Sequence, residues 1–154
     1  MWELATPKNI ASFDYQDNDE EGLFFLTNFE APNYRLVKIL YTGEVVEIIP
    51  ETDLALKSIS ILDDFIITNS INTDMNSMVE FYSKDGVLLD FKIPDDIEGT
   101  LSSFSMYKDK LRFSVSNFIN PTRYIDLDLN TLDYTIVWQD KVSNFNPADY
   151  EKTF

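Results

Sequence analysis

The side chains with the best spacing for chemistry in this sequence are carboxylates crowded into one short stretch. Residues 17–28 read "DNDEEGLFFLTN", with acidic side chains at Asp17, Asp19 and Glu21 ahead of a glycine. Alternating acidic residues before a glycine are typical of the start of a twelve-residue calcium loop. With Asp17 as position 1, position 12 is Asn28, where such a loop needs a bidentate glutamate. The pattern therefore favours an acidic surface turn at a strand end over a calcium site.

Adjacent carboxylates are the remaining candidates for acid/base catalysis. The pairs are Glu20–Glu21, Asp63–Asp64 and Asp95–Asp96. Neighbouring side chains on a strand point to opposite faces, and acidic pairs beside glycine or proline are typical of solvated turns. We expect no catalytic role for any of these pairs.

The composition removes most other enzyme chemistry. The chain has no histidine and no cysteine, so a Ser/His/Asp triad, a Cys/His dyad and the common zinc sites cannot be built within it. Its 4 glycines are not spaced as in a phosphate-binding loop or a nucleophile elbow. The sequence therefore assigns no catalytic, cofactor-binding or metal-ligating residue, and no cofactor.

Charge and hydropathy limit the class of partner. The formal net charge of -15 opposes binding to nucleic acid and to anionic membrane surfaces. The N-terminal stretch "MWELATPKNIASF" lacks the basic start and apolar core of a secretory signal, and apolar runs are far shorter than the roughly 20 residues of a membrane helix. A hydrophobic fraction of 44% is enough for one folded domain. We expect a soluble, acidic, cytoplasmic protein.

Strand signals run through the whole chain, and no sustained helical period interrupts them. Short segments rich in β-branched and aromatic residues are bounded by Asn, Asp, Gly or Pro: "GLFFLTN", "RLVKILY", "EVVEIIP", "DFIITNS", "MVEFYS", "VLLDFKI", "KLRFSVS", "RYIDLDL" and "YTIVWQ". Several are apolar on both faces, which requires sheets to stack face to face. The sequence predicts an all-β protein.

The strands repeat as a unit of four. Stretches that begin at Leu23, Phe65 and Leu111 each read strand, asparagine-containing loop, strand, tight turn, strand, and another candidate strand precedes each. Four antiparallel strands in a period of about 40 to 50 residues are typical of propeller blades. The sequence predicts one partial β-propeller domain over 1–154, with blades at about 11–52, 55–96 and 99–140 and an exit segment at 141–154.

Four stretches resemble the prolyl oligopeptidase (prolyl endopeptidase) family. "FDYQDNDEEGLFFLTNFEAPNYRLVKI" and "VEFYSKDGVLLDFKIP" resemble blades of its propeller, and "VSNFINPTRYIDLDLNT" resembles a later blade that reads close to "SFTSPSTIYRYDL". "NFNPADYEKTF" is similar to the segment that leads into its catalytic domain. The resemblance spans about Phe13 to Phe154. It implies the last three blades of a seven-bladed propeller, which in these cytosolic serine peptidases caps an α/β-hydrolase domain that cleaves short peptides after proline.

Two functions follow from this resemblance and from the residues. In the first, the chain is a non-catalytic gating segment whose partners are the hydrolase domain and the remaining blades, or a second copy bound through its terminal blades as a homodimer. In the second, it is a free-standing interaction module that presents the loops "NSINTDMNSM" and "NFINPTR" to a protein or peptide.

Individual side chains carry structural expectations. We expect Trp138 to pack between blades rather than to serve as a ligand platform. We expect Arg35 and Arg123 to have a paired structural role, such as bonding a carboxylate of a neighbouring blade, rather than to bind anions. Asparagines accept unusual backbone angles, so those near the predicted loops are expected to form turns: Asn69, Asn72, Asn117 and Asn120.

Overall fold

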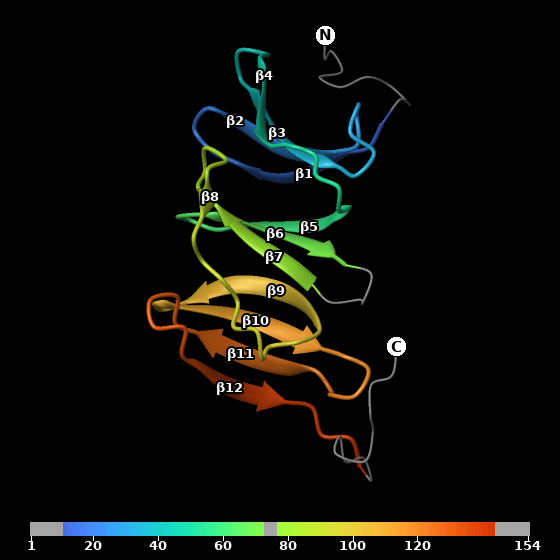
Figure 1. Ribbon diagram of the computed structural model, residues 1–154. Coiled ribbons are helices and arrows are strands. Elements are labelled where there is room, and N and C mark those ends of the chain that lie inside the picture. The colour runs from blue at the N-terminus through green and yellow to red at the C-terminus, as the bar shows by residue number, and fades with distance from the viewer. Residues whose placement is uncertain (1–10, 73–76, 144–154) are drawn as a thin grey trace.

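Three four-stranded antiparallel sheets make up the structure, a computed structural model that describes residues 11–72 and 77–143 (Figure 1). No helix occurs in these two described ranges, and no helix able to span a membrane is found there. The sheets lie one above another, with their strands roughly in parallel layers. The predicted fold class, a partial β-propeller of three four-stranded blades, is confirmed.

Each sheet is a meander in which consecutive strands are neighbours. The first sheet contains β1 (Phe13–Asn18), β2 (Gly22–Thr27), β3 (Arg35–Leu40) and β4 (Val45–Ile49). The second contains β5 (Leu56–Ile61), β6 (Ile66–Ile71), β7 (Ser77–Tyr82) and β8 (Leu88–Leu89). The third contains β9 (Thr100–Tyr107), β10 (Lys110–Ser116), β11 (Arg123–Leu127) and β12 (Tyr134–Gln139).

Two hydrophobic clusters hold the stack together. Between the first and second sheets, Phe24 and Leu36 pack with Ile66 and Tyr82. Between the second and third sheets lies a larger cluster that includes Phe81 and Phe113, both 0% exposed. Apolar side chains on both faces of the middle sheet explain why its strands read as continuous apolar runs rather than strict alternation.

The topology brings the chain's entry and exit to one side of the stack. Phe13 at the start of β1 pairs with Thr27 at the end of β2, and Gln139 at the end of β12 pairs with Arg123 at the start of β11. The β2–β3 and β10–β11 connections, the end of β6 and the start of β7 therefore lie on the same side as residue 11, where the described chain begins, and as the end of β12 (Figure 1).

The second sheet departs from the expected blade in two places. Asn69, expected in a loop, lies inside β6 and is 5% exposed; its Nδ2 donates to the Leu101 carbonyl of the third sheet at 2.7 Å, and its Oδ1 is buried without a partner. The segment "VLLDFKI", expected to be a full outer strand, pairs only through Leu88 and Leu89. The chain then leaves the sheet, and among the described residues no strand pairs with residues 77–80 of β7 on this edge.

Candidate functional site

The acidic turn between β1 and β2 is closed by a lysine. Lys38 of β3 places Nζ 2.7 Å from Asp19 Oδ2 and 2.7 Å from Glu21 Oε2. Asp19 Oδ1 also accepts hydrogen bonds from the amides of Glu21 at 2.9 Å and Gly22 at 3.1 Å. Asp17 belongs to β1, opposite Phe24, and not to this cluster. An ammonium group thus occupies the place that a cation would need.

This arrangement shifts the ionisation of both partners. Burial alone would raise the pKa of Asp19, but hydrogen bonds from Lys38 and from two backbone amides outweigh it and leave that pKa lowered. Burial likewise would lower the pKa of Lys38, and its bonds to the two carboxylates reverse the shift and raise it. Both groups therefore stay charged near neutral pH, as a structural ion pair requires.

The other carboxylate pairs are not assembled for catalysis. Asp63 and Asp64 are exposed between β5 and β6. Asp96 accepts a hydrogen bond of 2.6 Å from the Tyr134 hydroxyl, while its neighbour Asp95 lines a groove. Among the residues that the structure describes, no three acidic side chains gather as a metal site would need.

Arg35 and Trp138 make contacts within their own sheets rather than between blades. Arg35 Nη1 bonds Glu47 Oε2 at 2.8 Å, and Glu47 lies on the adjacent strand of the same sheet, not in a neighbouring blade. The Nε atom of Arg123 is buried without a partner. Trp138 is 50% exposed and packs edge-on against Tyr124 of its own sheet, with ring centroids 5.6 Å apart. The sequence does not show which face of a sheet is covered, so it could not assign these contacts.

The two outermost sheet faces differ in chemistry. On the first sheet, the ring of Phe25 packs edge-on against two other rings. Its centroid lies 6.5 Å from that of Phe13 and 6.1 Å from that of Tyr15. On the third, Arg112 makes two hydrogen bonds to Asp126, at 2.6 and 2.8 Å. The first outer face is therefore aromatic, and the third is polar at its centre.

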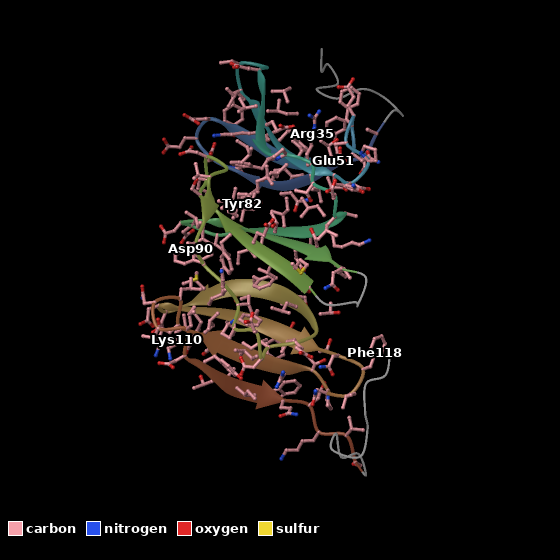
Figure 2. All side chains as sticks on the ribbon, in the orientation of Figure 1. Arg35, Glu51, Tyr82, Asp90, Lys110 and Phe118 are labelled. Atoms are coloured by element: carbon pink, nitrogen blue, oxygen red, sulfur yellow. The ribbon has the colours of Figure 1, made fainter. Side chains whose placement is uncertain are left out.

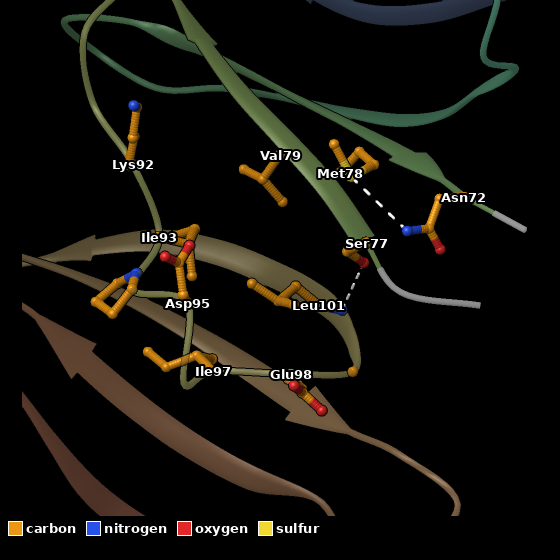
Figure 3. Close-up of a pocket in the computed structure, with 12 residues that line it drawn as sticks. Asn72, Ser77, Met78, Val79, Lys92, Ile93, Asp95, Ile97, Glu98 and Leu101 are labelled. Carbon is orange, nitrogen blue, oxygen red and sulfur yellow. Dashed lines mark hydrogen bonds between the residues drawn. The ribbon is translucent and has the colours of Figure 1, made fainter. Parts of the chain in front are cut away.

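A groove of about 480 Å³ lies between the second and third sheets (Figure 3). One wall is the start of β7, with Ser77 and Val79, and the other is the segment that runs from Lys92 to Gly99. Leu101 of β9 forms part of its floor. Sequence reasoning missed this groove, because it assigned residues 87–93 to a strand that would have filled it. The sequence carries no signal for the early end of this strand, since Asp90 and Lys92 alternate with apolar residues as in a one-sided strand, and Pro94 stops the pattern only after residue 93.

Comparison with known proteins agrees with this fold. Residues 1–140 match the family described as "Prolyl oligopeptidase, N-terminal beta-propeller domain". The chain is 28% identical to a prolyl endopeptidase of Dictyostelium discoideum over 92% of this chain and 20% of that protein. It is 23% identical to the dual function macrocyclase-peptidase POPB of Galerina marginata, over 99% of this chain and 22% of that protein.

Solved structures show the same architecture. Prolyl oligopeptidase B from Galerina marginata without ligand superposes with a TM-score of 0.80 at 22% identity, over 98% of this chain and 22% of that one. The present chain thus spans about a fifth of the length of the relatives it matches. The three stacked four-stranded sheets and the family match over residues 1–140 show that the chain belongs to the prolyl oligopeptidase N-terminal β-propeller family.

Proposed function

We propose that this chain is a non-catalytic gating segment of a prolyl oligopeptidase-like serine peptidase that cleaves short peptides after proline. Family membership supports this, together with the lack of histidine and of a nucleophile elbow in the sequence. The work of the segment is to narrow access to an active site that another domain supplies. As a member of a family of cytosolic peptidases, the protein is proposed to act in the cytoplasm.

The observation that carries this proposal is the common side on which the chain enters and leaves. Before β1, the Ser12 amide donates to Oδ1 of Asn28 in the β2–β3 loop at 2.7 Å. After β12, the Asp140 amide donates to the carbonyl of Thr122 in the β10–β11 loop at 2.8 Å. On that side Phe118, 83% exposed, projects from the β10–β11 loop (Figure 2). A domain joined to either end would lie over these loops, and an exposed aromatic ring suits an interface there.

The outermost faces supply the second contact. In a closed propeller each blade packs on two neighbours, so we propose that the remaining blades of the parent enzyme cover the outer faces of the first and third sheets. In the isolated chain, a second copy would cover the aromatic face around Phe25. The partners of this segment are therefore the hydrolase domain and the other blades, with a homodimer as the form of the chain alone.

A chimera tests the gating role. Residues 11–140 would replace the matching segment of the Dictyostelium prolyl endopeptidase. Hydrolysis of a short proline-containing reporter peptide would then be compared with hydrolysis of a folded protein that contains the same proline-containing sequence. We expect turnover of the short peptide within about tenfold of the parent enzyme, and no cleavage of the folded protein. The matched control carries Phe118→Ser, which should weaken the contact between domains and lower the thermal midpoint of the chimera.

Two results would contradict the proposal. Degradation of folded protein by a well-folded chimera would show that the segment does not restrict access. A chimera that folds but neither binds nor hydrolyses the short peptide would show that its loop side does not match a hydrolase domain.

A further inference from the structure

The open edge of β7 is bounded by hydrogen bonds at both ends. Beyond one end, Phe81 and Tyr82 pair with the two residues of β8. At the other end, the Ser77 amide donates to the Gly99 carbonyl at 3.0 Å, and Ser77 Oγ accepts from the Leu101 amide at 2.8 Å. Between these ends lies Val79, and in the described part of the chain no strand pairs with it on this side.

The direction of the Val79 backbone follows from strand alternation. The amides of Ser77 and Ser83 both donate away from β6, to the carbonyls of Gly99 and Val87. In an antiparallel ladder the backbone groups of alternate residues face the same edge. The N–H and C=O of Val79 therefore point into the groove and not toward β6. Such an edge is a template for another strand.

The walls of the groove define what would fit. Val79 and Ile93, both half-buried, offer apolar surface, while Ile97 and Leu101 beneath them are 6% and 3% exposed. The wall opposite β7 carries Asp95 and Glu98, both exposed (Figure 3). Together with the chain's net charge of -15, these carboxylates favour a cationic occupant over an anionic one, although Lys92 offsets part of their charge.

We propose that this groove binds a short extended peptide segment of another protein that carries lysine or arginine beside an apolar residue. The peptide backbone would add to β7 through the N–H and C=O of Val79, as in β-strand addition to an exposed sheet edge. Its apolar side chain would lie against Val79, and its cationic side chains near Asp95 and Glu98. The site lies wholly between the second and third sheets, so it stands whether or not the proposed gating role holds.

A labelled peptide probes the site directly. The probe is fluorescein-labelled Lys-Val-Lys-Val-Lys amide, titrated by fluorescence anisotropy against the full chain at low and at moderate salt. Two control peptides carry glutamate in place of lysine, or an N-methyl group on the amides that would pair. We expect the lysine peptide to bind at least about tenfold more tightly than either control.

A substitution at Val79 separates edge pairing from general attraction. Val79→Pro removes only the outward amide, since that N–H takes no part in the β6 ladder, and proline is tolerated at such an edge. Val79→Thr keeps the amide and a β-branched side chain. We expect Val79→Pro to weaken peptide binding at least about tenfold and Val79→Thr to change it less than about twofold.

Charge is tested with two variants of equal net charge. Asp95→Asn combined with Glu98→Gln should weaken the lysine peptide at least about fivefold. Asp63→Asn combined with Asp64→Asn, on an exposed turn away from the groove, should leave the affinity within about twofold. Equal weakening by both variants would show that the peptide senses only the overall charge, and would overturn the site.

Amide hydrogen exchange on the unmodified chain gives a readout that needs no variant. The Val79 amide should exchange fast in the free chain and become protected at least about tenfold when the lysine peptide is present, while Glu80, which pairs with Thr68 of β6, stays protected throughout. Absence of peptide binding at millimolar concentration, or binding without protection of Val79, would overturn the proposal even if Val79→Pro failed to fold.

Discussion

Replacing Lys38 by methionine tests whether the acidic turn is held by a structural ion pair. Lys38 is 7% exposed, its ammonium bonds Asp19 and Glu21, and Nζ lies 5.3 Å from the centre of the Phe24 ring. Methionine keeps most of the apolar stem, so the change mainly removes the charge and its hydrogen bonds. It leaves two carboxylates that water can reach, because the side chains of Asp19 and Glu21 are 42% and 76% exposed.

The expected loss in the free energy of unfolding follows from those exposed fractions. A hydrogen bond to a charged group contributes about 1.5 to 3 kcal/mol at most, and exposed ion pairs contribute about 0 to 1 kcal/mol. The bond to Glu21 belongs to the second class and the bond to Asp19 lies between the two, while relief of lysine desolvation offsets part of the loss. We therefore expect Lys38→Met to lower the free energy of unfolding by about 1 to 2 kcal/mol at pH 7. For a chain of this size that is a fall of about 2 to 8 °C in Tm.

The pH dependence gives the sharper test. The folded-state pKa of Asp19 is lowered, so its contribution is present above the unfolded value of about 3.9 and is lost as pH falls through the folded value. The pKa of Lys38 is raised, so its contribution is present below about 10.4 and is lost as pH rises through the folded value. Calorimetry should therefore show the gap between wild type and variant widest from about pH 5 to 9. A constant gap from pH 2 to 9, or a variant as stable as wild type, would refute the ion-pair reasoning.

Three further predictions follow from the same structure. The purified chain should not hydrolyse a small proline-containing reporter peptide, since it has no histidine to act as base; turnover that persists through purification and inhibitor controls would contradict this. Millimolar calcium and chelator should give equal thermal midpoints, because Lys38 occupies the acidic turn, and a reproducible rise of several degrees would contradict that. Burial and the bond to Glu80 raise the pKa of Tyr82 to about 12, so stability should fall as pH rises from about 10 through 12. Tyr82→Phe should remove that part of the fall in stability measured by calorimetry. A variant whose stability falls with pH as steeply as that of wild type would contradict the prediction.

The sequence predicted the architecture well because its period is set by local patterns. Each unit carries its own turn residues and its own β-branched or aromatic runs, so the four strands per sheet can be read without knowing how the sheets stack. The acidic turn was also interpretable, since Asn28 stands at the position where a calcium loop requires a charged bidentate ligand. In the structure Asn28 Oδ1 instead accepts the Ser12 amide at 2.7 Å.

What the sequence could not predict are features that arise between elements. Asn69 has the residue type of a turn former, yet it is buried in β6 because the Leu101 carbonyl of the next sheet offers its amide a partner. Arg35 bonds within its own sheet because Glu47 lies on the adjacent strand, and strand register decides that contact. The groove beside Val79 exists because β8 ends after two residues, and the apolar alternation of "VLLDFKI" gives no sign of that early end.

The two end faces bear on how the isolated chain associates. In a closed propeller each blade packs on two neighbours, so the terminal sheets of three blades each leave one face without a neighbour, which favours a ring of two half-propellers in which each first sheet meets a third sheet. On the third sheet, Asp126 is 6% exposed and already bonded to Arg112, while Tyr124 and Trp138 of the same face are 37% and 50% exposed. A two-fold axis would instead pair the aromatic face around Phe25 with itself. Light scattering of a concentration series then distinguishes the two arrangements. Phe25→Lys should abolish dimers in both, whereas Trp138→Lys should abolish them only in the ring; a strictly monomeric wild type at tens of micromolar in low and moderate salt would exclude both.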